Sequence, residues 1–545
     1  MSSRTIAELL TAADPTKARP LGELIDRLAA SGSLRGAREG GKAIGPAALA
    51  PIRIRGVTDD TRRLGPGNLF VAVRGAHVDG HDLVERAHAA GAVAAIVEQP
   101  VPGIDLPQLV VDTTTAALAD AVAWSYGDPS HELGVVGITG TDGKTTTSFL
   151  AVAALEAAGL SSGLVGTVET KIGGTREPNP EHMTTPGAPD LQRALRAMVG
   201  EGNAAAVVET TSHGLAADRV RGIAYDVAIL TNLTHEHLDF HGTWEAYRDA
   251  KLSLFERLAV SDRNPRKASP AWPKSAIVNV DDPTAGLFVG VAQEAGAQIV
   301  TYGTDATADV RATHSEEDAR RLRVTYEAPS GASSIELRLA GRFNVHNAMA
   351  VVALGEALEI DPAAVRAGLE SVEGVPGRME RVDAGQPFAV GIDYAHSPAS
   401  LEAVLGILAP VAAAGGGGLI AVFGSAGERD VEKRSIMGRI AGELGRLVIA
   451  TDEDPRGEDR EAILDEIARG AESAGRRRGH DLLLIADRPE AIAAAFERAR
   501  PGDIVLLAGK GHEHSIIGPA GPVDYDERRT ALEALADLGY SGART

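Results

Sequence analysis

The sequence predicts an α/β protein built from three domains, and three observations support this. The chain has 545 residues, more than a single compact core usually organises. From about residue 131, apolar strands alternate with alanine-rich helices, which is typical of a mostly parallel sheet. A second block with the same alternation begins near Pro376. We therefore predict domains at residues 1–130, 131–375 and 376–545.

The expected elements follow in chain order. The first region mixes short strands such as LFVAV with the helical stretch LVERAHAAGA. The expected strands of the central region are GVVGIT, AAAVVE, DVAIL, SAIVNV and QIVTYG. Those of the third region are FAVGIDY, LIAVFG, RLVIATD, DLLLIAD and DIVLLAG. The segment DRNPRKASPAWPK is rich in proline and charge, so we expect an exposed loop there.

Composition limits the classes of function. The formal net charge of −21 argues against a basic surface for nucleic acid. The absence of cysteine excludes disulfides, thiolate metal sites and cysteine nucleophiles. The N-terminus reaches Glu8 before an apolar segment of signal-peptide length develops. Pro410 and the glycines at 415–418 interrupt the uncharged stretch 403–427, so we predict a helix end, a loop and a buried strand there. We expect a soluble, cytoplasmic protein without a membrane span, and a monomer.

The stretch GVVGITGTDGKTTTSFL, residues 134–150, has the composition of a phosphate-binding loop between a strand and a helix. Its spacing departs from the common pattern, because Ile138 stands where that pattern has its first glycine. The backbone N–H groups of residues 140–144 would face an anion at a helix N-terminus. Lys144 would neutralise the outer phosphates, and the Thr145 hydroxyl would suit Mg²⁺. A glycine turn beside a surface lysine is the alternative.

Acidic and histidine side chains follow the next two expected strands. Glu209 stands at the carboxyl end of AAAVVE, where open α/β sheets hold their ligands. Its carboxylate would suit Mg²⁺ beside the phosphates, and a solvated strand-end glutamate is the alternative. His235, His237 and His241 lie close together after DVAIL, a density that first suggests zinc.

These motifs resemble the Mur ligase family. Residues 140–145, GTDGKT, resemble the family's phosphate loop Thr-Gly-Thr-(Asn/Asp)-Gly-Lys-Thr. TNLTHEHLDFHG resembles its Thr-Asn-Leu-Thr-x-Asp-His-Leu-Asp-x-His-Gly signature, and YRDAKLSLF resembles its Tyr-x-x-Ala-Lys-x-x-Leu-Phe. The resemblance runs from about residue 50 to residue 535. It implies a UDP-binding α/β domain, a central ATPase-like domain with a phosphate loop, and a Rossmann-like C-terminal α/β domain.

The resemblance also implies the reacting groups and two Mg²⁺ ions. The implied catalytic residues are Lys144, Lys251, His237 and Glu209, and the implied metal ligands are Thr145, Glu209, His237 and Lys251. Lys251 would be carbamylated by CO₂, which turns a cation into an anion that can lie near both metals. Glu236 stands where the family usually has aspartate, so one extra methylene must be accommodated there.

The binding residues are carried over from the family's motifs. For ATP they are Gly140, Thr141, Asp142, Gly143, Lys144, Thr145, Thr146, Asn344, Asn347, Arg378 and Asp393. For the UDP-linked substrate they are Thr61, Arg62, Ala76, His77, Val78, Thr184, Thr185, Ser212 and Arg219. For the added amino acid they are Arg429, Glu453, Asp454, Pro455, Arg456, Gly509 and Glu513.

Two signals about the added amino acid oppose each other. In members that use meso-diaminopimelate the specificity loop reads Asp-Asn-Pro-Arg, and here it reads Glu453-Asp454-Pro455-Arg456. Arg456 would pair bidentately with the distal carboxylate of diaminopimelate. Asp454 adds a negative charge that would favour a plain distal ammonium, as in L-lysine or L-ornithine. The sequence leaves this choice open.

The resemblance implies an ATP-dependent amide ligase of peptidoglycan precursor synthesis. It would join a diamino acid to UDP-N-acetylmuramoyl-L-alanyl-D-glutamate through an acyl phosphate. A folylpolyglutamate-type ligase is one alternative, although Thr61 and Arg62 lie in a UDP-binding region that such ligases lack. The ligase that adds D-Ala-D-Ala is another, and GERDVEKR and GKGHE argue against it. A nucleotide-binding assembly protein without turnover is the third.

Overall fold

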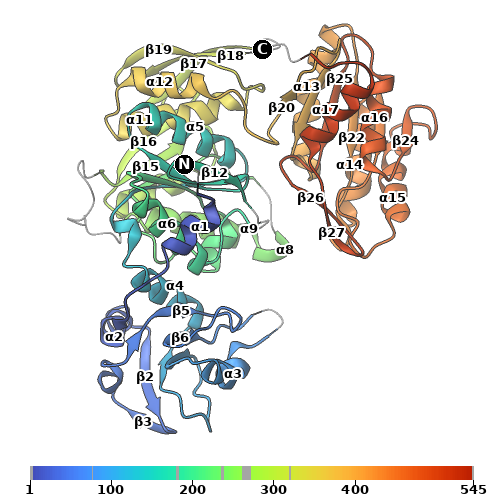
Figure 1. Cartoon of the computed structure of the whole chain (residues 1–545). Helices are drawn as coiled ribbons and strands as arrows, with labels where there is room; N and C mark the ends of the chain where they lie inside the picture. Colours follow the sequence, from blue (N-terminus) through green and yellow to red (C-terminus); the bar gives the residue numbers. More distant parts are fainter. Residues whose placement is uncertain are drawn as a thin grey trace. The chain divides into compact units, whose positions relative to one another are not determined.

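The computed structural model describes residues 4–75, 78–179, 183–234, 238–259, 272–317 and 321–542. The chain divides into two compact units. The first comprises Met1–Glu316, Leu322–Leu337 and Arg342–Val372, and the second comprises Glu317–Arg321, Arg338–Gly341 and Glu373–Thr545. Figure 1 shows two sheets in the first unit and one main sheet in the second, each covered by helices. The predicted α/β class is therefore confirmed.

The first sheet in the chain is a six-stranded sheet, counted over the described residues, with the order β3-β2-β8-β7-β6-β5. Strands β5 to β8 run parallel, and β2 and β3 join antiparallel at one edge. Its strands are β2 (Leu34–Glu39), β3 (Lys42–Ile44), β5 (Gly56–Thr58), β6 (Asn68–Val71), β7 (Ala94–Val97) and β8 (Gln108–Val111). Helices α2 (Leu21–Ala30) and α4 (Thr114–Ser125) share one core with the sheet, and α3 (Val84–Ala89) shares another. The short strands β1 (Arg19–Pro20) and β4 (Arg53–Ile54) pair separately.

An N-terminal helix, α1 (Ile6–Ala12), lies on the second sheet instead of the first. Thr5 and Glu8 form a reciprocal capping box at its start. Ile6 and Leu9 are buried in the same hydrophobic cluster as Leu195 of α6 (Ala188–Gly200). Helices as short as α1 are marginal alone, so this packing is what stabilises it.

The second sheet carries the loop that is predicted to bind phosphate. Over the described residues it has eleven strands in the order β12-β11-β10-β13-β9-β14-β15-β16-β17-β18-β19. The central strands from β10 to β16 are parallel, and antiparallel strands extend both edges. The strands are β9 (Gly134–Thr139), β10 (Ser162–Val165), β11 (Glu169–Ile172), β12 (Thr175–Pro178), β13 (Ala205–Glu209), β14 (Val227–Leu230), β15 (Ser275–Asn279), β16 (Gln298–Gly303), β17 (Val310–Glu317), β18 (Leu322–Ala328) and β19 (Gly331–Leu337).

Helices cover both sides of this sheet. Figure 1 shows α5 (Lys144–Ala157), α11 (Asn344–Ala357) and α12 (Pro362–Ser371) on one side, and α6 and α9 (Trp244–Glu256) on the other. The remaining helices are α7 (Ser212–Ala216), α8 (Leu238–His241) and α10 (Ala285–Glu294). Strands β9, β13 and β14 are buried almost throughout, which explains their continuous apolar sequences. Their carboxyl ends all meet at the same edge, and the predicted loop lies there.

The second unit is built on a sheet with the order β20-β21-β25-β22-β23-β24. All its neighbours pair in parallel except β20 with β21. The strands are β20 (Glu380–Val382), β21 (Ala389–Asp393), β22 (Leu419–Phe423), β23 (Leu447–Ala450), β24 (Leu482–Leu484) and β25 (Ile504–Ala508), and β26 (Ser515–Gly518) and β27 (Gly521–Asp524) form a separate hairpin. The helices are α13 (Pro398–Ala414), α14 (Glu432–Leu444), α15 (Arg460–Ser473), α16 (Arg488–Arg498) and α17 (Glu527–Asp537).

Alternate side chains along β22 pack into hydrophobic cores on opposite faces of this sheet. Ala421 and Phe423 belong to the core under α13, α14 and α15, whereas Ile420 and Val422 belong to the core under α16 and α17. Successive side chains of a strand point to opposite faces, so a strand buried on both sides has no polar position. This is the burial expected for a doubly covered parallel sheet.

The helix end, loop and buried strand expected within residues 403–427 are confirmed, since α13 ends at Ala414 and β22 begins at Leu419. Pro410, however, does not end the helix but lies inside it. A proline within a helix costs about 3 kcal/mol because it removes one hydrogen bond. Buried apolar side chains on both sides of it, Leu408 and Ala412, offset that cost.

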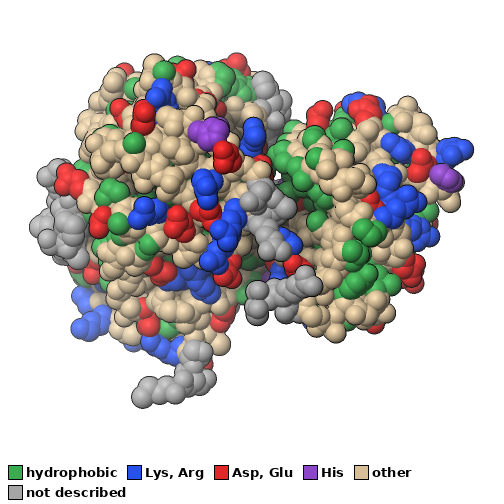
Figure 2. All heavy atoms as spheres, turned by 90° about the horizontal axis from the view of Figure 1, so that it is seen from above, with side chains coloured by type: hydrophobic (Ala, Val, Ile, Leu, Met, Phe, Trp, Pro, Cys, Tyr) green, Lys and Arg blue, Asp and Glu red, His purple; other side chains and the backbone are tan. Residues whose placement is uncertain are grey.

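Within the described residues, no helix combines the length and the apolar character that crossing a membrane requires. On the face shown in Figure 2, Lys and Arg side chains are spread among Asp and Glu side chains.

Candidate active site

The loop after β9 has the backbone that the glycines of the sequence predict. Gly140 and Gly143 have φ of +148° and +82°, values that other residues adopt rarely. A Cβ on Gly140 would lie 1.8 Å from Thr231 Oγ1, and one on Gly143 would lie 2.4 Å from Asn347 Oδ1. The loop therefore packs too closely on its neighbours to hold any other residue at these two positions.

Lys144 begins α5 and turns back over the loop. Its Nζ donates to the carbonyl oxygens of Gly140 at 2.8 Å and Thr141 at 2.6 Å. The Thr141 hydroxyl lies 2.9 Å from the hydroxyl of Tyr247, and the Thr141 N–H donates to the carbonyl oxygen of Asn232. The ammonium is thus held over a helix N-terminus, the place where phosphate groups bind.

Glu209 lies directly beside the start of α5. Its carboxylate is fully buried and accepts hydrogen bonds from the hydroxyl of Thr145 at 3.0 Å and from the hydroxyl of Thr167 at 2.8 Å. The backbone N–H of Thr167 donates to its other oxygen. The structure therefore brings together two predicted metal ligands that are 64 residues apart.

Lys251 reaches the same loop from α9. Its side chain is 2% exposed, and its Nζ donates to the carbonyl oxygen of Gly140 at 2.7 Å. The Nζ also lies over the ring of Tyr247, 4.6 Å from the centroid. Lys144 and Lys251 thus share one backbone acceptor, although the sequence separates them by more than a hundred residues.

Asn344 and Asn347 lie at the start of α11. Asn347 accepts a hydrogen bond from the Thr147 hydroxyl at 3.2 Å and donates to Asn344 at 2.8 Å. Both side chains are buried next to α5, and Thr146 is buried on the same helix. Asp142 lies in the loop, and its N–H donates to Asn232.

Four of the residues predicted to hold the UDP-linked substrate gather next to Glu209. The hydroxyl oxygens of Thr184 and Thr167 lie 2.9 Å apart. The Thr185 hydroxyl donates to the carbonyl of Glu209, and the guanidinium of Arg219 donates to the carbonyl of Thr185 at 2.8 Å. The hydroxyl of Ser212 is buried without a hydrogen-bond partner in the described part of the chain.

The predicted residues of the first domain are only partly described. Arg62 is exposed and pairs with Asp60 at 2.8 Å, which lowers the pKa of Asp60. Thr61 is half-buried beside it, and Val78 is exposed. Ala76 and His77 lie outside the described residues.

The histidine segment is also incomplete. His235, Glu236 and His237 lie outside the described residues, so the predicted metal role of His237 stays a prediction. His241 ends α8 and stacks edge-on against Tyr247, 5.4 Å between centroids. No group of three or more His, Asp or Glu that suits a metal ion occurs in the ranges that the structure describes.

The second unit holds Arg378 and Asp393, the remaining residues that are predicted to bind ATP. Asp393 ends β21 and accepts N–H bonds from Met379 at 2.8 Å and Ala395 at 2.9 Å. Burial raises the pKa of Asp393, and the charge of Arg378 opposes that rise. The Arg378 guanidinium lies over the ring of Tyr394, 5.0 Å from the centroid.

The predicted amino-acid residues form a second cluster at the carboxyl edge of this unit's sheet. Glu453 lies against the turn at Gly509, where an added Cβ would be 3.2 Å from Glu453 Oε2. That oxygen and the Nε of Arg456 are both buried and have no hydrogen-bond partner among the described residues. Arg456 also has a left-handed backbone, with φ of 54°, and Pro455 precedes it. Arg429 is exposed on the neighbouring loop after β22.

The Asp454 carboxylate already accepts hydrogen bonds from other groups of the protein. Its Oδ1 accepts from Lys510 Nζ at 2.9 Å and from the N–H of Ile517 at 2.8 Å. Lys510 is fully buried and also pairs with Glu513 at 2.6 Å, whose other oxygen accepts from Tyr394. The extra charge at position 454 is therefore neutralised by a buried lysine.

Thr167 and Lys510 also belong to these clusters, although their motifs do not mark them as site residues. Thr167 follows β10 directly, so the rule that ligands lie at the carboxyl ends of parallel strands would have found it. Lys510 stands between two predicted residues in AGKGHEH, but nothing in its spacing shows that it faces Asp454. That contact joins residues 56 positions apart.

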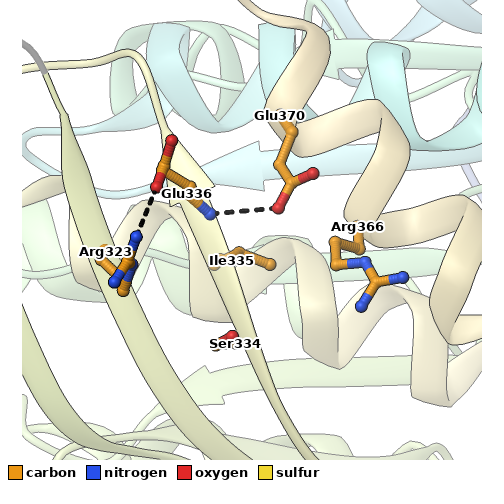
Figure 3. Close-up of a pocket in the computed structure, with 6 residues that line it drawn as sticks. All are labelled: Arg323, Ser334, Ile335, Glu336, Arg366 and Glu370. Carbon is orange, nitrogen blue, oxygen red and sulfur yellow. Dashed lines mark hydrogen bonds and ion pairs between the residues drawn. The ribbon is translucent and has the colours of Figure 1, made fainter.

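A separate pocket of 410 Å³ lies at the far edge of the second sheet. Figure 3 shows its lining residues, Arg323, Ser334, Ile335, Glu336, Arg366 and Glu370. Arg323 pairs with Glu336 at 2.9 Å, and the Glu336 N–H donates to Glu370. None of the predicted site residues lines this pocket.

Comparisons with known proteins agree with the site's motifs. Residues 53–123 match the model "Mur ligase family, catalytic domain", 138–355 match "Mur ligase middle domain", and 377–511 match "Mur ligase, glutamate ligase domain". A UDP-N-acetylmuramyl-tripeptide synthetase of Roseiflexus sp. (strain RS-1) is 49% identical over 91% of this chain and 98% of its own. A UDP-N-acetylmuramoyl-L-alanyl-D-glutamate–2,6-diaminopimelate ligase of Geobacter metallireducens is 41% identical over 90% of this chain and 96% of its own.

The fold comparison agrees. A solved structure of a UDP-N-acetylmuramoyl-L-alanyl-D-glutamate–2,6-diaminopimelate ligase superposes with a TM-score of 0.64 and 30% identity, covering 91% of this chain and 98% of that one. The three matched regions together span most of the chain in the order that its motifs predict. The chain therefore belongs to the Mur ligase family.

Proposed function

We propose that this protein is an ATP-dependent ligase that joins a diamino acid to UDP-N-acetylmuramoyl-L-alanyl-D-glutamate in peptidoglycan precursor synthesis. The observation that carries the proposal is the convergence of Lys144, Glu209 and Lys251 on one glycine loop at the carboxyl edge of the second sheet. Thr185 bonds the backbone carbonyl of Glu209, and Thr184 and Arg219 lie next to it through Thr167 and Thr185, which gives a place for the second substrate. The names of the relatives supply the chemical identity of that substrate.

The reaction begins with transfer of a phosphoryl group. A carboxylate oxygen of the D-glutamate side chain attacks the γ-phosphorus of ATP, the bond to the β-phosphate oxygen breaks, and ADP leaves. Lys144 and the N–H groups at the start of α5 neutralise the charge on the transferred group. The diamino acid's amine then attacks the acyl phosphate, loses a proton, and releases inorganic phosphate, which leaves an amide.

The donor set near Glu209 suits Mg²⁺. The Thr145 hydroxyl and the buried Glu209 carboxylate are hard oxygen donors next to the phosphate loop. Mg²⁺ bound there would neutralise phosphate charge during transfer. Lys251 in its ammonium form would repel a nearby Mg²⁺ ion, and we therefore propose that Lys251 is carbamylated. We also propose that His237 is a metal ligand.

The second unit favours diaminopimelate as the diamino acid. Lys510 neutralises Asp454, so Asp454 is not available to hold a distal ammonium. Glu453 Oε2 and Arg456 Nε are charged-group atoms that are buried without hydrogen-bond partners in the described part of this cluster. One anion and one cation complement a distal centre that carries both an ammonium and a carboxylate. Lysine or ornithine would leave the half-buried Arg456 without a carboxylate to pair with.

The proposal includes the three-domain division at residues 1–130, 131–375 and 376–545. The first domain would bind the UDP moiety through Thr61, Arg62 and residues 76–78. The third would supply Arg378 and Asp393 to ATP and Arg429 to the amino acid. We propose that the protein acts as a monomer in the cytoplasm.

A single assay tests the proposal. Purified protein is mixed with ATP, MgCl₂ and UDP-N-acetylmuramoyl-L-alanyl-D-glutamate, and phosphate release is measured with diaminopimelate, L-lysine or L-ornithine. We expect release that depends on both substrates, with the highest kcat/KM for diaminopimelate and a product mass that is larger by one diaminopimelate residue. Absence of release with all three amino acids would refute ligase activity. A preference for lysine would refute the charge argument alone.

A further inference from the structure

Arg488, the first residue of α16, is a fully buried cation that the proposed reaction does not use. It forms an ion pair with Glu527 at 2.6 Å, and both side chains are 0% exposed. Its Nη1 donates to the carbonyl oxygen of Asp452 at 3.0 Å, and its Nη2 donates to the carbonyl oxygen of Ala508 at 2.8 Å. Its Nε donates to Glu527 at 2.8 Å. The planar guanidinium thus satisfies three separate acceptor groups at once.

The two carbonyls immediately precede the two loops that are proposed to hold the amino acid. Asp452 is followed by residues 453–456, and Ala508 is followed by residues 509–513. Their strands, β23 and β25, are not neighbours, because β22 lies between them. Ladder hydrogen bonds therefore do not join the two loops, which start about 10 Å apart at the usual strand spacing. Arg488 spans this gap at the base of the two loops, and the ion pair of Asp454 with Lys510 at 2.9 Å spans it within them.

Glu527 extends the connection to the β26–β27 hairpin. Its Oε2 accepts from the hydroxyl of Tyr525 at 2.5 Å, and the Tyr525 N–H donates to the carbonyl of His514. Ile517 of the same hairpin accepts the N–H of Arg456 at 2.8 Å. Loop 453–456, loop 509–513 and the hairpin are therefore tied to one buried ion pair.

A stabilising role alone is a poor explanation for such a pair. Burying two charges costs free energy that an apolar pair of similar size does not, so buried ion pairs often add no net stability. An apolar side chain at position 488 would fill the space but would leave both strand-end carbonyls without a donor. What the arginine adds is a fixed spacing between them.

We propose that Arg488, held by Glu527, is a positioning residue that sets the spacing between the two amino-acid-binding loops and thereby the KM for the diamino acid. This inference rests on the proposed function for its kinetic part. Arg488 itself does not reach the reacting groups of the described site, since its hydrogen bonds all go to the backbone and to Glu527.

The test compares an apolar replacement of the pair with a matched control. The double variant Arg488→Met/Glu527→Leu removes both buried charges together, which protects the fold. The control is the double variant Arg446→Met/Asp503→Asn, which removes both charges of an ion pair of 2.6 Å at the amino end of β25, the opposite edge of the same sheet. Hydrogen–deuterium exchange of residues 453–456 and 509–513 is measured in both, followed by KM for diamino acid and for ATP.

We expect faster exchange in both loops of the double variant and a KM for the diamino acid about tenfold higher, the effect of roughly one lost hydrogen-bonded contact. The KM for ATP should stay within about twofold, and Arg446→Met/Asp503→Asn should change neither loop. Unchanged loop exchange in a folded double variant would overturn the inference. If the double variant does not fold, Arg488→Lys gives the same test, because it keeps the charge but cannot reach both carbonyls.

The two proposals fail separately. If the unaltered protein releases no phosphate with any diamino acid, the proposed function is refuted. The exchange measurement still decides whether Arg488 positions the loops. If the protein is an active ligase and the double variant keeps both its exchange and its KM, only the positioning role is refuted.

Discussion

Replacing Lys510 by methionine should destabilise the second unit strongly. Lys510 is 0% exposed and bridges Asp454 at 2.9 Å and Glu513 at 2.6 Å. Its removal leaves the buried carboxylate of Asp454 and the half-buried carboxylate of Glu513 close together without a cation, and breaking a buried pair in this way costs about 3–5 kcal/mol. For a unit of this size each kcal/mol lowers Tm by about 2–4 °C, so a loss of roughly 6–20 °C is expected.

Thermal unfolding followed by circular dichroism measures this loss, and Lys433→Met is the matched control. Lys433 is half-buried, and its Nζ donates to the carbonyl oxygen of His396, so its loss strands no carboxylate. Adding Asp454→Asn to Lys510→Met should recover about half of the loss, because one of the two uncompensated anions disappears. A Tm of Lys510→Met within about 1 °C of that of the unaltered protein would contradict the buried charge cluster. So would effects of Lys510→Met and Asp454→Asn on Tm that simply add.

Three further predictions concern the loop, the metal site and pH. Gly140→Ala should lower phosphate release at least about a hundredfold, because its Cβ would lie 1.8 Å from Thr231 Oγ1 and displace the loop; normal turnover would show that the loop tolerates the shift. Lys251→Ala should be nearly inactive and should regain part of its rate with added acetate or propionate, and full activity without them would contradict a carbamate role. Burial raises the pKa of Asp452 above its ordinary 3.8 although its hydrogen bond to Arg460 opposes this. The stability that the Asp452 carboxyl group contributes is thus complete below about pH 4 and is lost as pH rises through the raised pKa. The Tm of Asp452→Asn minus the Tm of the unaltered protein should therefore increase from pH 4 to pH 8. A Tm difference that stays constant with pH would contradict the raised pKa.

The parallel sheets and the phosphate loop could be predicted because their signals are local. Strand β9 is a short apolar run, the glycines follow it directly, and α5 begins at Lys144. The rule that ligands lie at the carboxyl ends of parallel strands then places Glu209 near the loop without any knowledge of the packing. The structure gives that proximity as 3.0 Å between Glu209 and Thr145.

Contacts between distant residues could not be predicted in the same way. Arg488 and Lys510 look like ordinary charged residues in the sequence, and only the fold shows that both are buried at one edge of a sheet. The continuation of α13 through Pro410 could not be predicted for a related reason. A local rule places a helix end near a proline, but the buried side chains before and after Pro410 in the helix decide where it ends.

The position of α1 limits how the first domain can move. The chain starts on the second sheet with Ile6 and Leu9, leaves it to build the first domain from Arg19 onward, and returns through α4 to β9. The first domain is consequently joined to its neighbour by two covalent crossings. A body attached at two points turns easily only about the line between them, so swinging of this domain should follow a single axis. Deleting the first eighteen residues would remove the second attachment and leave the crossing through α4 together with the ion pair of Arg63 with Asp190 of α6.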